Sequence, residues 1–195
     1  MHFRGPRFIV AIATLVAMQT VFGDEVFEID SARSHADFEV KVMWFVGIRG
    51  DFGAIKGNLT VDRFHGTATV EADIDTNDLH MRTRSYETWA KSNEFFDSQH
   101  FPKIHFLSDS FPLVRLNNGG DIEGKLTLLG IVRPIHFDLD AADCDNPLKG
   151  KCPVEAYGLI HRSDFGMQSR RGALSDKVQL RLSAFVNTPP TDSLP

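Results

Sequence analysis

The sequence lacks the patterns that mark most enzymes and nucleic-acid-binding proteins. None of its serines lies in a Gly-x-Ser-x-Gly turn, and no Gly-rich loop joins a strand-like to a helix-like segment to hold a phosphate. Its eight histidines are scattered singly, without a His-x-x-x-His or Glu-containing zinc pattern. The net charge is −5 and the basic residues are dispersed, which argues against nucleic acid as a partner. We therefore expect a non-enzymatic protein with no metal and no resident cofactor.

Long apolar runs are also scarce. The longest, at residues 8–18, follows Arg4 and Arg7 and is shorter than the roughly 20 residues that a membrane span needs. Val21-Phe22-Gly23 then fits a cleavage site, so we expect a signal peptide over residues 1–23 and a soluble, exported mature protein; an uncleaved anchor is the alternative. No cysteine follows the run to carry a lipoprotein anchor.

The two cysteines, Cys144 and Cys152, bracket a polar, turn-rich loop at residues 145–151. In an oxidising compartment such a pair is expected to form a disulfide that closes the loop. Free thiols or a metal site are the alternative, but no third and fourth ligand stands nearby for zinc.

Most of the chain after Asp24 alternates apolar and polar residues in short runs, which predicts strands with one buried face. We expect Gly47 and Gly50 to break one such run. About eight strands follow from this pattern, which suits an all-β sandwich or an up-and-down barrel with its polar face in water. Several expected inward positions carry glycine or alanine, among them Gly124 and Gly158. Small residues there either leave room for a guest or let neighbouring groups approach closely.

A helical segment is expected near residues 84–96, where good helix formers precede Phe95 and Phe96. Pro102 should end any helix before it. Two interpretations remain open: a helix that packs its aromatic residues on a sheet, or a helix that covers the mouth of a barrel holding an apolar guest.

Taken in order, several motifs resemble the YceI-like family of exported polyisoprenoid-binding proteins, from about Val26 to about Val186. The matching segments are Phe38-Glu39-Val40, Gly50-Asp51-Phe52, Phe95-Phe96-Asp97, Phe101-Pro102-Lys103-Ile104-His105-Phe106, Gly124-Lys125-Leu126-Thr127 through Arg133-Pro134-Ile135, and Arg162-Ser163-Asp164-Phe165-Gly166. The chain departs from the family pattern at Arg33 and Val42, positions that we expect near the mouth or the headgroup.

The resemblance implies a lipocalin-like antiparallel β-barrel of about eight strands, formed by residues 24–187 and followed by a flexible tail at 188–195. It also implies a periplasmic protein that sequesters or carries an isoprenoid (of polyprenyl or isoprenoid-quinone type) or a similar long-chain amphiphile in the lumen. The alternative is an interaction module that docks on a membrane redox or envelope-stress partner. A membrane-protein partner and a homodimer are both left open.

Site residues follow from the inward-facing positions and from the helical segment. Each lumen candidate has plain core packing as its alternative, and each headgroup candidate has plain solvent exposure. The lumen candidates are Phe38, Val40, Val42, Trp44, Phe52, Val70, Phe106, Leu126, Phe137, Ile160 and Phe165. The lid candidates are Trp89, Phe95 and Phe96, and the candidates for contact with an anionic headgroup are Arg82, Arg84, Arg170 and Arg171.

Overall fold

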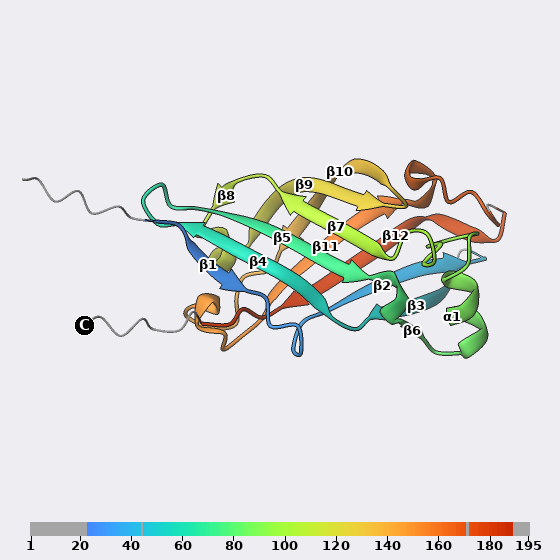
Figure 1. Ribbon diagram of the computed structural model, residues 1–195, viewed down its shortest axis with the longest axis horizontal. Coiled ribbons are helices and arrows are strands. Elements are labelled where there is room, and N and C mark those ends of the chain that lie inside the picture. The colour runs from blue at the N-terminus through green and yellow to red at the C-terminus, as the bar shows by residue number, and fades with distance from the viewer. Residues whose placement is uncertain (1–22, 44, 171, 189–195) are drawn as a thin grey trace, which may run out of the picture.

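The computed structural model describes residues 23–43, 45–170 and 172–188, and within them one antiparallel sheet makes up most of the molecule (Figure 1). Residues 1–22 and 189–195, where the signal peptide and most of the tail are expected, lie outside the described residues. The strands are β1 (Glu25–Glu28), β2 (His35–Val42), β3 (Val46–Phe52), β4 (Ile55–Asp62), β5 (Thr67–Asp75), β6 (Leu79–Met81), β7 (Lys103–Ser108), β8 (Phe111–Pro112), β9 (Gly120–Leu128), β10 (Ile131–Leu139), β11 (Val154–His161) and β12 (Leu174–Ala184). The helical segments are α1 (Arg84–Ala90), α2 (Arg115–Asn118) and the single turns η1 (Thr76–Asp78), η2 (Pro147–Lys149) and η3 (Arg162–Phe165).

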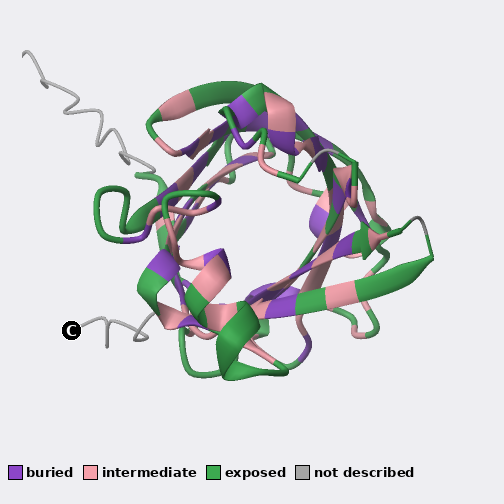
Figure 2. Cartoon of the chain, turned by 90° about the vertical axis from the view of Figure 1, so that its right-hand side faces the viewer, coloured by how far each residue is buried: buried purple, intermediate pink, exposed green. Residues whose placement is uncertain are grey.

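The sheet curls around on itself. Its strand order is β1-β4-β5-β7-β9-β10-β11-β12-β2-β3-β6, and β8 pairs with β5. The chain just after β1 meets the end of β12, where the amide of Asp30 donates to the carbonyl of Phe185 at 2.8 Å and Ile29 pairs with Val186. Viewed from the end that carries α1, the strands form a ring (Figure 2). The expected antiparallel barrel is therefore confirmed.

The strand count depends on which strands are included. Among the described residues the sheet has twelve strands, and eight of these contain seven or more residues: β2, β3, β4, β5, β9, β10, β11 and β12. The alternation of apolar and polar residues indicated seven of these eight, whereas β3, which contains Gly47 and Gly50, was not expected as a strand. Of the four shorter strands, β1 and β7 were also indicated by alternating residues, at Phe27 and at Ile104 and Phe106. The other two, β6 and β8, have three and two residues and are too short for a periodic pattern.

The expected break at Gly47 and Gly50 is wrong. Strand β3 runs through both glycines from Val46 to Phe52. Gly50 lies opposite Phe38 on β2, and a Cβ atom at Gly50 would lie 2.4 Å from Cε1 of the Phe38 ring. This glycine therefore makes room for a neighbouring aromatic ring within a continuous strand.

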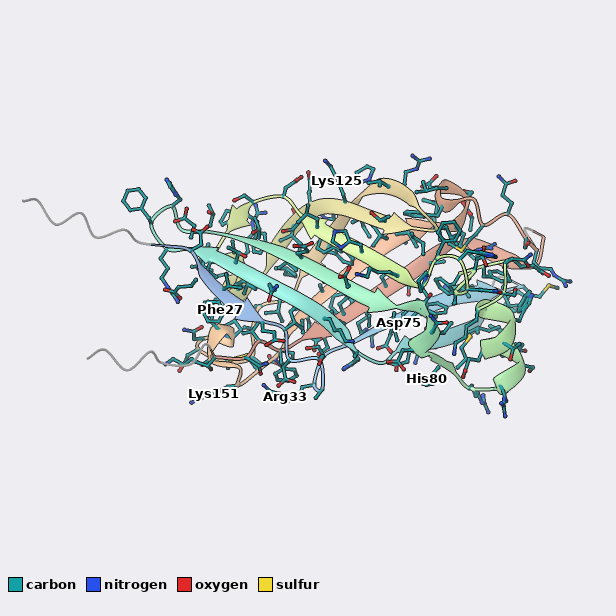
Figure 3. The ribbon with its side chains drawn as sticks, in the orientation of Figure 1. Phe27, Arg33, Asp75, His80, Lys125 and Lys151 are labelled. Atoms are coloured by element: carbon teal, nitrogen blue, oxygen red, sulfur yellow. A yellow bond between two sulfur atoms is a disulfide. The ribbon has the colours of Figure 1, made fainter. Side chains whose placement is uncertain are left out.

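One end of the barrel, which we call the filled end, is closed by packed side chains. Leu59 and Val61 on β4 are 3% and 0% exposed and lie with Phe27 in the core. The cysteine loop is at the same end: Cys144 and Cys152 form the expected disulfide, with their Cα atoms 6.0 Å apart. Arg33 donates a hydrogen bond of 2.9 Å to the carbonyl of Gly150, so it ties this loop to the barrel (Figure 3). The expectation that Arg33 lies near the mouth is therefore wrong.

The opposite end, which we call the open end, carries α1 and the β2–β3 turn (Figure 1). Thr83 caps α1 by accepting a hydrogen bond from the amide of Tyr86. The helix ends at Ala90, well before Pro102, and the chain continues in turns through Phe95 and Phe96. No helix in the described residues is long and apolar enough to cross a membrane.

Candidate functional site

An apolar cavity of about 120 Å³ lies inside the barrel, in the half nearer the open end. Nine strands contribute to its wall: β2, β3, β5, β6, β7, β9, β10, β11 and β12. Tyr86 on α1 lines the cavity and is also 43% exposed, so the cavity reaches the surface beside this helix. We call this cavity the lumen.

Most of the expected lumen residues line it. The seven that do are Phe38, Val40, Phe52, Phe106, Leu126, Phe137 and Ile160. Each belongs to the inward face of its strand, as the alternation of the sequence indicates. Whether they contact a ligand stays a prediction.

Three expected lumen residues lie elsewhere, and a fourth is not described. Val42 is the last residue of β2, beside the turn, and packs against the core from a half-buried position. Val70 lies opposite Leu59, next to the side chains of the filled end. Phe165 is 2% exposed and lies on η3, beyond the end of β11. Trp44 lies outside the described residues.

Two aromatic rings of the wall lie over glycines of neighbouring strands. Phe38 covers Gly50, and Phe137 covers Gly158, where an added Cβ would lie 2.6 Å from Cε1 of the Phe137 ring. The space that each glycine leaves is thus filled by a ring held against the wall. At these two positions the glycine therefore lets a neighbouring ring approach closely and does not leave room for a guest. Ala72, by contrast, lines the lumen itself.

All three expected lid residues also line the lumen. Phe96 packs on the wall, with its ring centroid 5.5 Å from that of Phe38 and 5.4 Å from that of Phe52. Trp89 and Phe95 form an edge-to-face pair at 4.6 Å. Helix α1 and the segment that follows it therefore cover the lumen with aromatic side chains, and Phe96 also packs on the sheet. That this cover closes over an apolar guest stays a prediction.

Sequence reasoning missed one charged residue of the site. Arg162 lines the lumen and is 3% exposed. Its guanidinium donates to the carbonyls of Ser175 at 2.9 Å and Ser169 at 3.3 Å, and it lies 5.8 Å from the centroid of the Phe95 ring. Arg162 thus ties the loop before β12 to the lid. The Arg-Ser-Asp-Phe-Gly segment that resembles the family motif contains Arg162 and could have indicated its importance. The alternation of apolar and polar residues ends with β11, just before Arg162, so it does not show which way this side chain points.

The three described headgroup candidates lie outside the lumen, at the open end. Arg82 and Arg84 are exposed on either side of the start of α1. Arg170 is exposed as well, with its guanidinium carbon 5.6 Å from the Trp89 ring centroid and its Nε 4.0 Å from Glu94. Arg171 lies outside the described residues. All three described arginines are thus exposed at the end of the barrel where the lumen reaches the surface, and Arg170 contacts the lining residue Trp89.

The outer face of the barrel carries the one group among the described residues whose spacing suits a metal ion. Its members, Asp121, His136 and Asp138, are all exposed, and their ligand atoms lie within 4.8 Å of one another. They lie on β9 and β10 and point away from the lumen. This group has no part in the apolar site.

Comparison with known proteins identifies the family. The model of the YceI-like domain matches residues 27–185. Protein YceI of Salmonella arizonae is 28% identical over 162 residues, which cover 80% of this chain and 84% of that protein.

Two solved structures share the fold. BcnA of Burkholderia cenocepacia has a TM-score of 0.65 at 20% identity, covering 80% of this chain and 98% of that chain. A polyisoprenoid binding domain from Saccharophagus degradans has a TM-score of 0.60 at 14% identity, covering 84% and 98%. Because the family model spans most of the sequence, the chain belongs to the YceI-like family.

Proposed function

We propose that this protein binds the tail of an isoprenoid, or of a similar long-chain amphiphile, in its lumen and sequesters or carries it in the periplasm. The observation that carries the proposal is the lumen itself, a cavity lined mainly by apolar side chains and covered by Trp89, Phe95 and Phe96. Binding of polyisoprenoid by the related domain from Saccharophagus degradans supports the choice of guest.

The size of the lumen bears on how such a guest enters. Cavities of about 150 Å³ in other proteins take up benzene, so a lumen of about 120 Å³ accommodates roughly one isoprene unit with the side chains as they lie. A longer tail requires Phe96 to leave its place against Phe38 and Phe52. Each methylene that is then buried contributes about 0.8 kcal/mol, so the tail needs no hydrogen bond for useful affinity.

The polar end of the guest is assigned to the open end. Arg82, Arg84 and Arg170 are exposed there, and guanidinium groups suit phosphate and other anionic headgroups. The headgroup then remains in water while the tail lies among the aromatic residues. This arrangement spares the headgroup the cost of burial.

The test is native mass spectrometry of the gently purified mature protein, with lipid extraction from the same sample. We expect a bound mass of isoprenoid type, and uptake of added geranylgeraniol by protein from which lipid has been removed. Ala72→Phe should abolish both, because the ring would fill the lumen at a residue that lines it. Ala36→Leu serves the same purpose if that variant does not fold.

Leu159→Phe is the matched control, since Leu159 is 46% exposed on β11 and does not line the lumen. It should bind like the wild type. A wild-type protein that is free of lipid and takes up no geranylgeraniol would contradict the proposal, as would equal binding by a folded Ala72→Phe variant.

A further inference from the structure

We propose that the open end of the barrel docks on the surface of an anionic phospholipid bilayer, with the β2–β3 turn entering the interface. The apolar side chains that carry this proposal are Met43, Phe45 and Val46 on the turn and Tyr86 on α1. The charged ones are Arg82 and Arg84. Together these six residues form what we call the docking end.

The β2–β3 turn exposes large apolar side chains where a turn in water ordinarily carries polar ones. Phe45 is 81% exposed, Met43 56% and Val46 57%. Exposed apolar groups concentrated at one place mark a site of interaction, whereas single ones need no explanation. The turn therefore calls for a partner that accepts apolar side chains.

Hydrogen bonds hold the turn to the barrel. The amide of Met43 donates to the carbonyl of Ala173 at 2.8 Å, and the amide of Phe45 donates to that of Val42 at 3.2 Å. Leu174, at the start of β12, pairs with Val42. A turn held in this way loses less conformational freedom on binding than a free loop would.

The turn is continuous with the lumen. Val46 is exposed at the start of β3, and Ile48, two residues along the same strand, lines the lumen. Tyr86 belongs to both regions, since it lines the lumen and is 43% exposed. Contact of the docking end with a bilayer would therefore place the opening of the lumen against the membrane.

Charge favours an anionic bilayer. Arg82 and Arg84 are exposed and form no ion pair with another described residue. Three carboxylates at this end have cationic neighbours: Glu39 pairs with Arg49 at 2.6 Å, Glu87 pairs with Lys91 at 2.9 Å, and Glu94 lies 4.0 Å from Arg170. Basic residues beside exposed aromatic and aliphatic ones are typical of proteins that lie on an anionic membrane surface. Because the chain as a whole carries −5, this attraction is local to the docking end.

A protein partner fits the docking end less well. Stable protein–protein interfaces take about 20–30 residues a side, whereas this apolar surface consists of four described side chains, three of them on one turn. A small apolar projection at an end that also carries exposed guanidinium groups suits an interface in which lipid headgroups and chains adjust around it. The benefit of docking rests on the proposed function: a tail passes from bilayer to lumen without crossing water.

The test is sedimentation with vesicles of phosphatidylglycerol or of phosphatidylcholine, at low and at high salt, for variants that remain folded. We expect the wild type to bind phosphatidylglycerol vesicles, and to bind less at high salt because salt screens exposed charges. The double variant Met43→Ser/Phe45→Ser should bind at least about tenfold more weakly. Arg82→Gln and Arg84→Gln should each lower the affinity roughly fivefold for phosphatidylglycerol, with little change for phosphatidylcholine.

Phe64→Ser provides the matched control. Phe64 is 80% exposed, almost the same as Phe45, but lies on the β4–β5 turn at the filled end (Figure 1). It should bind vesicles like the wild type. Docking is refuted if wild-type protein does not bind phosphatidylglycerol vesicles, or if Phe64→Ser weakens binding as much as the double variant does. A folded wild type captured by a membrane protein but not by lipid-only vesicles would also refute it.

A second measurement separates docking from lipid binding. Geranylgeraniol is offered to each protein either from dilute ethanol or from phosphatidylglycerol vesicles. Docking predicts that Met43→Ser/Phe45→Ser takes up the lipid normally from ethanol and slowly from vesicles. If wild-type protein binds vesicles but takes up no lipid from either source, the proposed function fails while docking stands. If it takes up lipid from ethanol without binding vesicles, docking fails and the proposed function stands.

Discussion

At the scale of single residues, the outer face of β2 and β3 places two carboxylates opposite each other. Asp37 and Asp51 are cross-strand partners, and like charges in this arrangement destabilise a sheet. The pKa of the Asp51 carboxyl is raised, first by burial and then by its hydrogen bond with Asp37 and the charge of Asp37, against the smaller opposing effect of His35 and His80. The folded protein therefore holds the Asp51 proton more tightly than the unfolded chain does.

The raised pKa of Asp51 makes the free energy of unfolding depend on pH in a definite direction. The contribution of protonated Asp51 is fully present below the pKa of the unfolded chain and is lost as the pH rises through the higher folded pKa. Asp51→Asn should therefore stabilise the protein at pH 7 by about 0.5–1 kcal/mol, and the gain should shrink in acid. Urea unfolding at a series of pH values measures it, with exposed Asp109→Asn as the control. If Asp51→Asn stabilised the protein equally at every pH, the raised pKa of Asp51 would not be the cause.

At the scale of secondary-structure elements, an aromatic ring on one strand packs against a glycine on the neighbouring strand. Phe137 on β10 lies over Gly158 on β11, and its ring also meets Phe106 on β7 edge-on at 5.3 Å. A methyl group at Gly158 has no room unless the Phe137 ring moves. Three strands are thus coupled through one side chain.

Gly158→Ala should therefore cost about 1–3 kcal/mol of the free energy of unfolding, because the displaced ring strains the wall. Adding Phe137→Leu should recover part of this loss, since the residues are in contact and their effects are not additive. Chemical denaturation of the single and double variants measures both. Gly172→Ala is the control, as nothing lies within 4 Å of an added Cβ there. Additive effects at Gly158 and Phe137 would contradict the explanation.

At the scale of the whole molecule, the barrel is divided along its length. Side chains such as Val61 pack the filled end, while the lumen occupies the other half under the segment that follows α1. Phe96 bridges lid and wall through its contacts with Phe38 and Phe52. The position of this one ring limits how long a guest the lumen accepts.

Phe96→Ala should let longer chains bind. In a series of linear alcohols, wild-type affinity should rise by about 0.8 kcal/mol per methylene until the lumen is filled, and then by less, because further length must displace Phe96. In Phe96→Ala that change of slope should move to longer chains. Competition against a fluorescent fatty acid measures the series, with Phe64→Ala as the control. An unchanged break in slope would show that Phe96 does not limit the lumen.

Much of the fold was predictable because its signals are local. Alternation over a few residues separates Leu126, which faces inward, from Lys125, which is exposed on the outer face (Figure 3). The disulfide was predictable as well, since Cys144 and Cys152 are close in sequence. For the candidate site, the same alternation placed seven of the expected residues in the lumen and indicated aromatic cover from the segment after α1.

The sequence by itself determined which side of most strands faces inward, because side chains alternate between the two faces along a strand and the apolar face is the one that is buried. Only the tertiary structure decided which inward residues line a cavity. Val70 and Ala72 share one face of β5, yet Val70 meets the filled end and Ala72 the lumen. The tertiary structure also brought Arg162 beneath Phe95 and the Tyr86 side of α1 beside the lumen. These placements depend on how the sheet curls and which segments meet across it, and contacts between residues far apart in the chain leave no periodic signal in the sequence.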